Sequence, residues 1–231
     1  MGNKLLSGAG VREPGTEDIA APAPEALRAA VAAFTGATAA SATSLAEDAR
    51  TDLDPALRDH RRELLRWLNS WGCRLRYPRP GETDLFEAGV RDWWALWAAS
   101  LPAAAGSLAE LTDPQIDAVA GCFGALAAVP VGAPERPRPL GPTAASKLLY
   151  RLRPQAVMPW DEAIARRLHG ARDAVAFAAH QRLGRSWARH LLATTGLDER
   201  AVASELGGAG RSLAKILDDY CYVRFTRAAE G

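Results

Sequence analysis

An all-α fold is predicted by three features of this 231-residue chain. Apolar residues recur at helical spacing, as in the stripe that runs from Ile116 to Leu126. Two strong helix starts, Asp54-Pro55 and Asp113-Pro114, each place a capping side chain before a residue that has no amide hydrogen. No segment shows the sustained apolar–polar alternation of a strand, and no internal repeat is visible.

The first half is expected to begin with a loose arm over residues 1–22, which lacks periodicity. Small residues at Thr35–Thr43 predict a linker, and Ser44 and Glu47 have the spacing of a capping box. The helices expected in this half are Glu25–Phe34, Asp54–Ser70, one that starts at Thr83 or Asp84 and ends near Leu101, and one that starts at Asp113. The second is expected to bury Leu57, Leu64, Leu68 and Trp71. The five tryptophans between Trp67 and Trp97 are interpreted as core, because aromatic rings at helical spacing bury much area.

In the second half, Pro130–Pro139 is interpreted as an interior linker because prolines bound it. A turn and short helix follow at Leu140, and a second helix opens at Asp161. A helix over Arg172–Thr195 is expected, with Gly196 as its C-terminal cap. Its expected core row is Val175, Ala179, Leu183, Trp187 and Leu191. Asp198 and Ser212 start the last two helices. We expect one helical domain over residues 23–231, with halves at 23–130 and 140–231.

Charge is distributed unevenly along the chain. Residues 1–130 carry 12 basic and 17 acidic side chains, a net of −5, whereas residues 131–231 carry 16 and 10, a net of +6. A basic half favours a polyanion partner. The alternative is that the many arginines reflect a GC-rich genome and solvated helix faces. The three separated cysteines predict buried free thiols, and the lack of a signal peptide or a long apolar run predicts a cytoplasmic protein without a membrane partner.

The stretch Leu140–Arg167 carries the residues most suited to chemistry. The turn at Gly141 precedes a helix, so outward-pointing amides near Thr143 and the helix dipole favour one phosphate, with Lys147 one turn further on. Asp161 is placed as a helix N-cap, which favours its ionised form, and Trp160 beside it is a candidate pocket wall. Such a carboxylate can stabilise an oxocarbenium-like sugar or orient a water molecule. A purely structural cap is the alternative.

This stretch resembles the helix-hairpin-helix DNA glycosylases, in which a Gly-rich hairpin opens a helix and an aspartate caps the next one. Gly141-Pro142-Thr143 is similar to the end of the hairpin, and Met158-Pro159-Trp160-Asp161 to the approach to that aspartate, 18 residues after Thr143. The resemblance covers about 30 of the 231 residues. It implies two helical halves around a cleft, with a helix-hairpin-helix-like element in the second half.

Departures from the family pattern limit the chemistry that the resemblance implies. The first glycine of the hairpin is replaced by Pro137-Arg138-Pro139. Thr143 stands where lyase members carry a lysine, so no Schiff base is expected. No four-cysteine loop follows Leu191, so no iron–sulfur cluster or other cofactor is implied. Spacing gives no zinc site either, and His60, His169, His180 and His190 are interpreted as surface or core-edge residues.

Two further groups of charged residues have open interpretations. Arg182, Arg185 and Arg189 lie three and four residues apart on one helix. They predict either a row that binds phosphates or a charged outer face. Asp218 and Asp219 are adjacent, and neighbours on a helix point about 100° apart, so a solvated face is favoured over a catalytic pair.

The preferred hypothesis is a DNA-glycosylase-like protein that binds double-stranded DNA through the Gly141 turn and the basic half. As an enzyme it would be a monofunctional N-glycosidase for a damaged or modified base in base excision repair. Asp161 would stabilise the sugar cation, and water would be the nucleophile. The alternatives are a non-catalytic helical binding module with that fold, and an enzyme that acts on a small nucleoside or metabolite.

Overall fold

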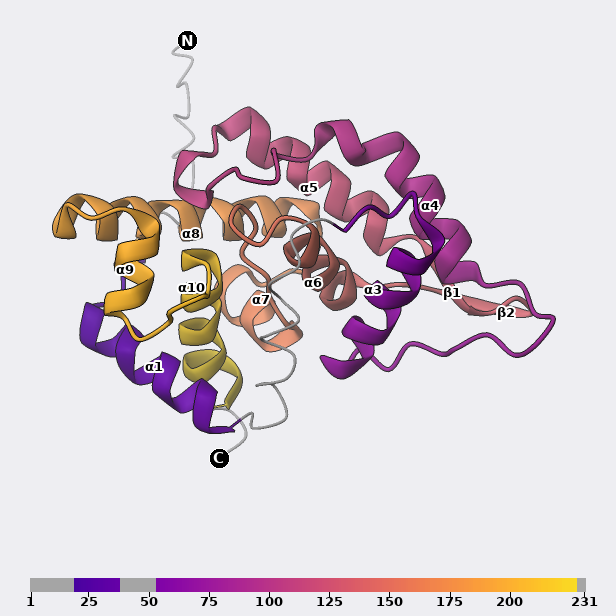
Figure 1. Cartoon of the computed structure of the whole chain (residues 1–231), viewed down its shortest axis with the longest axis horizontal. Coiled ribbons are helices and arrows are strands. Elements are labelled where there is room, and N and C mark those ends of the chain that lie inside the picture. Colours follow the sequence, from indigo (N-terminus) through magenta and orange to yellow (C-terminus); the bar gives the residue numbers. More distant parts are fainter. Residues whose placement is uncertain (1–18, 38–52, 228–231) are drawn as a thin grey trace, which may run out of the picture.

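The computed structural model describes residues 19–37 and 53–227, and this part of the chain is mostly helical, with a two-stranded sheet (Figure 1). The all-α prediction is therefore confirmed. The α-helices are α1 (Pro24–Ala37), α3 (Arg58–Ser70), α4 (Leu85–Trp97), α5 (Asp113–Ala127), α6 (Pro142–Leu152), α7 (Glu162–His169), α8 (Ala174–Thr195), α9 (Glu199–Glu205) and α10 (Leu213–Cys221). Short turns of other helix types are η2 (Ala98–Ser100), η3 (Leu108–Glu110) and η4 (Tyr222–Thr226).

Several helix ends are set by the capping residues that the sequence predicts. The side chains of Asp84, Asp161, Asp198 and Ser212 each accept a hydrogen bond from an amide in the first turn of the helix that follows. Gly196 ends α8 in the left-handed conformation. Two predicted starts shift. Thr112 caps α5 with Gln115 in a capping box, and α3 begins at Arg58 because Asp54 forms a turn before it.

The predicted linker at Pro130–Pro139 is wrong, because these residues form a β-hairpin. Strands β1 (Pro130–Ala133) and β2 (Arg136–Pro139) pair antiparallel, with Pro130 opposite Pro139. A proline cannot donate to a ladder, so it is confined to strand ends and edge positions. Both strands are edges of this small sheet, which explains why it tolerates its prolines. The hairpin packs on α4 and connects α5 to α6.

The core lies where α5 packs against α6 and α8. Of the predicted core tryptophans, Trp67 and Trp93 are buried, and the other three are half-buried. The stripe from Ile116 to Leu126 is buried as predicted. Leu57 and Val175 are corrections, because they are 52% and 80% exposed. A row of residues four apart drifts about 40° per step on a helix with 3.6 residues per turn, so Val175 and Leu191 cannot share a face.

Helix α1 joins the second half of the chain in space. It packs against α10, and Arg28 Nε donates to the carbonyl oxygen of Glu205 at 3.3 Å (Figure 1). Trp187 Nε1 on α8 donates to the carbonyl oxygen of Ile19 at 3.0 Å, so residues just before α1 also touch that half. Residues 1–18 of the predicted arm over residues 1–22, and the capping box at Ser44 and Glu47, lie outside the described residues.

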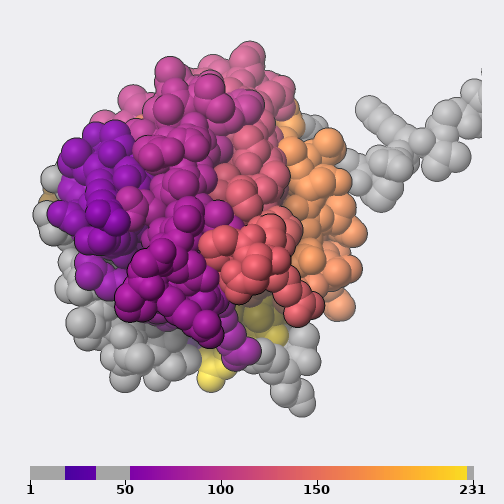
Figure 2. Space-filling model, turned by 90° about the vertical axis from the view of Figure 1, so that its right-hand side faces the viewer, coloured from indigo at the N-terminus to yellow at the C-terminus, as the bar shows by residue number. Residues whose placement is uncertain are grey.

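The opposite end of the molecule is built from α3, α4 and the hairpin. Figure 2 views this end and shows the hairpin, in red, next to the segment that joins α3 to α4. Arg138 on β2 donates to the carbonyl oxygen of Arg74 in that segment at 3.4 Å. Within the described ranges, no helix has the length and apolar character that crossing a membrane requires.

Candidate functional site: a capped hub and an arginine groove

The loop that leads to Asp161 is held by side chains from two helices. Gln181 on α8 accepts from the Met158 amide at 2.9 Å and donates to the Met158 carbonyl oxygen at 2.8 Å. His180 Nε2 donates to the Pro159 carbonyl oxygen at 3.1 Å. Ser146 on α6 donates to the Trp160 carbonyl oxygen at 2.9 Å. These bonds satisfy buried backbone groups of a segment without secondary structure, so the position of Asp161 is fixed by both helices.

Both carboxylate oxygens of Asp161 are engaged within the chain. Oδ1 accepts from the Ile164 amide at 2.9 Å, which makes Asp161 the N-cap of α7. Oδ2 accepts from the Thr226 hydroxyl at 2.7 Å, which ties η4 to the start of α7. The side chain is half-buried and lines neither of the two hollows described below. These contacts favour the structural cap, and a catalytic role stays a prediction.

The Gly141 turn lines a shallow hollow of about 270 Å³, together with Thr143 and Arg172. Gly141 has a φ of 87°, which a residue with a Cβ rarely adopts. Its amide donates to the Ala127 carbonyl oxygen at 3.0 Å, and the Leu140 amide is bonded too, so two of the amides expected to be unpaired are not. Arg172 pairs with Glu162 at 2.9 Å. Several of the groups that could bind a phosphate in this hollow therefore already have partners within the chain.

Lys147 does not reach the hollow at the Gly141 turn. Its Nζ donates to the Trp71 carbonyl oxygen at 2.8 Å and lies 5.5 Å from the centre of the Trp71 ring. The lysine therefore joins α6 to the end of α3. Of the three residues predicted to hold a phosphate there, the structure brings Gly141 and Thr143 together and directs Lys147 elsewhere.

The arginine row on α8 joins that helix to η3 and to the first turns of α5. Arg182 pairs with Asp117 at 2.5 Å, and Arg185 pairs with Asp113 at 2.7 Å. Arg189 Nε donates to the carbonyl oxygen of Ala109 in η3 at 2.7 Å. Because these guanidinium groups already have partners inside the chain, the contacts disfavour both a phosphate-binding row and a merely solvated face.

Trp160 lies in the core and is only 1% exposed. Its ring packs edge-on against Phe123 and Phe177, with centroids 5.6 and 5.1 Å away. The predicted pocket wall is therefore a core residue in this structure. The Trp160 ring also lies next to the rings of His169 and His180, which places these two histidines in a surrounding of low dielectric constant.

His169, which is half-buried, and the buried His180 form a pair that the sequence interpretation missed, since it placed His180 at the surface or core edge. His180 is fully buried, and the two ring nitrogens that face each other, Nε2 of His169 and Nδ1 of His180, are 3.1 Å apart. A carbonyl oxygen only accepts, so His180 carries its proton on Nε2 and its Nδ1 accepts from His169. Burial lowers the pKa of His169 to about 4, and burial together with His169 lowers the pKa of His180 to about 3. Both rings are neutral at pH 7.

Asp218 and Asp219 are also corrections, because both are buried on α10 and pair with the fully buried Lys215. Asp219 pairs with Arg211 as well, at 2.8 Å. Burial by itself lowers the pKa of Lys215, but the two carboxylates raise it above its usual value. The lysine is therefore a charged structural residue. Burial raises the pKa of Asp218 to about 6, with the ammonium of Lys215 opposing.

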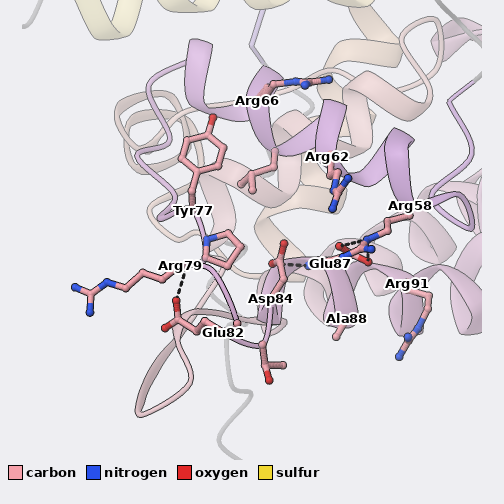
Figure 3. A pocket seen from close by; sticks show the side chains of 14 residues that line it. Arg58, Arg62, Arg66, Tyr77, Arg79, Glu82, Asp84, Glu87, Ala88 and Arg91 are labelled. Carbon is pink, nitrogen blue, oxygen red and sulfur yellow. Dashed lines mark hydrogen bonds and ion pairs between the residues drawn. The ribbon is translucent and has the colours of Figure 1, made fainter.

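A larger groove, of about 670 Å³, lies between α3, α4 and the segment that joins them (Figure 3). The residues that give it its character are five arginines: Arg58, Arg62, Arg66, Arg79 and Arg91. The first three are one helical turn apart on α3, about 6 Å from one to the next along the axis. Figure 3 shows Arg58 and Arg62 pointing toward α4, with Arg91 opposite on α4.

Of the three acidic side chains that line the groove, Glu82 and Glu87 are already matched by cations, and Asp84 caps α4. Arg58 and Arg61 bind Glu87 and, although partial burial opposes it, lower its pKa. Arg76 pairs with Glu82 at 2.7 Å, which lowers the pKa of that carboxyl. Both carboxylates are therefore ionised and neutralised.

Other arginines of the groove retain free donors. Among the described residues, the guanidinium groups of Arg66 and Arg79 have no ion pair or hydrogen bond, and Arg62 has only a 3.7 Å contact with exposed Asp59. Arg91 pairs with its exposed neighbour Asp92, a surface pair of little strength. The groove therefore presents guanidinium donors of Arg66 and Arg79 that have no partner among the described residues.

The sequence interpretation did not include this groove, because the net negative charge of residues 1–130 favoured a polyanion site in the second half instead. A signal was present, since arginines recur at positions 58, 62 and 66 on the face away from Leu64 and Leu68. Comparisons with protein-family models, curated proteins and solved structures each find no match to this chain. No group of three or more potential metal ligands occurs in the part that the structure describes.

Proposed function

We propose that this chain is a nucleic-acid-binding protein that holds backbone phosphates in the groove between α3 and α4. The row formed by Arg58, Arg62 and Arg66 carries the proposal, because two of its members lack strong partners and face an open groove. Guanidinium groups bind phosphate oxygens in a bidentate manner, and they release condensed counterions when they do. The spacing of one helical turn is comparable with that of neighbouring phosphates along a strand.

The relation to DNA glycosylases is part of the same proposal. In its detailed form, the proposal includes two helical halves around a cleft and a helix-hairpin-helix-like element at Gly141. It also includes a cytoplasmic role in base excision repair. The bonds of Asp161 to Ile164 and Thr226 support a structural cap. The version that the geometry supports best is therefore the non-catalytic module, with base hydrolysis at Asp161 as the second candidate. An enzyme for a small nucleoside would not need the arginine row.

The binding claim is tested with fluorescently labelled oligonucleotides, single-stranded and duplex, by anisotropy at low salt. The test variant is Arg62→Ala/Arg66→Ala. The matched control is Arg200→Ala/Arg224→Ala, which removes two exposed arginines that do not line the groove. We expect the test variant to weaken binding roughly tenfold or more and the control to change it little. Equal loss in both variants, or no binding by the wild type, would refute the proposal.

Catalysis is tested separately by base release from DNA that carries a panel of damaged and modified bases. The proposal predicts no release by the wild-type protein. Release that is abolished in a folded Asp161→Asn variant would establish the glycosylase instead, because asparagine preserves the helix cap and removes the charge.

A further inference from the structure

Tyr77 is the one aromatic residue among the large apolar side chains that are exposed in the described part of the chain, at 53%. It lines the same groove as the arginine row. Figure 3 shows its ring on the side of the groove opposite Arg58 and Arg91, with Arg66 at the same end of the groove. An exposed ring beside cations without partners is the combination that binds a phosphate and a flat base together.

The backbone on both sides of Tyr77 is fixed by hydrogen bonds. Asn69 on α3 accepts from the Leu75 amide at 2.6 Å and donates to the Leu75 carbonyl oxygen at 2.9 Å. Leu75 itself is buried. Beyond the ring, the Arg79 amide donates to Glu82 at 2.7 Å. The backbone that carries the ring is therefore held in place before a ligand arrives, which reduces the ordering cost of binding.

The size of the groove limits what it can hold. Sites for drug-sized molecules span roughly 300–1,000 Å³, and the groove has about 670 Å³. One or a few nucleotides fit this volume, whereas a double helix is far too wide to enter. A duplex would contact only the rim, where it would gain phosphate contacts and no contact between a base and the ring.

We infer that the groove takes an unpaired nucleotide segment, with phosphates along Arg62 and Arg66 and a base stacked on Tyr77. This inference rests on the proposed nucleic-acid-binding function and narrows it to single strands, loops or extruded bases. Every base has a flat π-face, so recognition by stacking tolerates changes of sequence. An acidic peptide would satisfy the arginines but would leave the tyrosine ring unused.

The test compares Tyr77→Ala and Tyr77→Phe with the wild-type protein. Leu96→Ala serves as the control, because Leu96, which is on α4, is also a large exposed side chain but does not line the groove. Folding of each variant is checked by thermal unfolding, which an exposed side chain should change little. Binding is measured with one oligonucleotide sequence, as a single strand and as a duplex, and with polyglutamate as a competitor. A single strand that carries 2-aminopurine reports stacking through quenching of its fluorescence.

We expect the wild type to prefer the single strand, and Tyr77→Ala to weaken that binding about tenfold and to remove the quenching. Tyr77→Phe and Leu96→Ala should retain both, and duplex binding should be the same in all variants. Equal affinity for single strand and duplex, or full single-strand binding by Tyr77→Ala, would overturn the inference while the arginine variants still test the binding function. Competition by polyglutamate at equal charge would overturn it in favour of an acidic peptide. A wild type that binds no oligonucleotide would remove both claims.

Discussion

Replacing Lys215 with methionine should destabilise the fold strongly. Lys215 is fully buried, and its ammonium pairs with Asp218 and Asp219, whose side chains are 10% and 0% exposed. The same group lies 4.1 Å from the centre of the Phe34 ring on α1 and 5.0 Å from that of Trp71 after α3. The lysine therefore links α10 to α1 and to the end of α3.

The magnitude follows from which charges lose their partners in Lys215→Met. Asp219 keeps Arg211, at 2.8 Å, whereas Asp218 loses the one cation that pairs with it in the described part of the chain. Removing one partner of a buried ion pair costs about 3–5 kcal/mol. For a chain of this length each kcal/mol lowers Tm by about 2–4 °C, so we expect a fall of roughly 6–20 °C near pH 7.5.

The cost should also depend on pH. Burial raises the pKa of Asp218 to about 6 in the wild type, and without the ammonium it rises further. A carboxyl whose pKa is raised in the folded state stabilises the fold at low pH and loses that contribution as pH rises through the folded pKa. The deficit of Lys215→Met should therefore shrink between about pH 7.5 and pH 5.

Urea unfolding of Lys215→Met, followed by tryptophan fluorescence at both pH values, measures the deficit. Arg200→Met is the control, because Arg200 is exposed and its loss should change the free energy of unfolding by no more than about 0.5 kcal/mol. A loss for Lys215→Met below about 1 kcal/mol, or one that does not change with pH, would refute the reasoning.

Three further predictions concern the elements around Asp161. Because burial lowers the pKa of His180 to about 3, the wild type should lose about 1.4 kcal/mol of stability per pH unit below 6.5 from this residue, until the folded ring protonates. In a pH series of Tm values, the fall should be shallower in His180→Gln than in the wild type, and the remaining fall includes the contribution of His169, whose pKa burial lowers to about 4. Asp161→Ala should lower the free energy of unfolding by about 0.5–2 kcal/mol and Asp161→Asn by much less, as measured by urea unfolding, and equal losses would rule out the cap as the reason. Gly184→Ala should cost about 1–3 kcal/mol, because the new Cβ would lie 2.9 Å from Met158 Sδ, whereas Gly124→Ala, with its nearest atom at 3.4 Å, should be neutral or stabilising in the same assay.

Local signals in the sequence predict much of this fold. The caps at Asp84, Asp161 and Ser212 hold because a capping side chain and the amides that it satisfies lie within one turn of each other. The stripe from Ile116 to Leu126 is likewise buried as its spacing predicts. Interactions of short range in the chain can be read without knowledge of the tertiary structure.

The sequence predictions are wrong where tertiary packing determines which residues are buried or which secondary structure forms. Two adjacent aspartates, Asp218 and Asp219, can both be inside because α10 is enclosed on several sides, and Lys215 at three and four residues' distance supplies the counter-charge. The hairpin at Pro130–Pro139 depends on packing against α4, which no pattern within its own residues reveals.

In the candidate sites, too, the local features were predictable and the contacts between distant residues were not. The cap geometry of Asp161 was predictable, but its hydrogen bond from Thr226 joins residues that are 65 positions apart. The arginine groove combines α3, α4 and the segment between them, and only the row on α3 has a periodicity that the sequence displays. Which arginines retain free donors depends on ion pairs such as Arg58–Glu87, whose members come from different helices.

The most direct test of the nucleic-acid-binding claim is the salt dependence of wild-type affinity for a single-stranded oligonucleotide. If Arg62, Arg66, Arg79 and Arg91 contact phosphates, the logarithm of the binding constant should fall with the logarithm of salt concentration with a slope of about −3. Arg62→Ala/Arg66→Ala should bring the slope to about −1.4. A wild-type slope near zero, or the same slope in that variant, would contradict the claim that this groove binds a phosphate backbone.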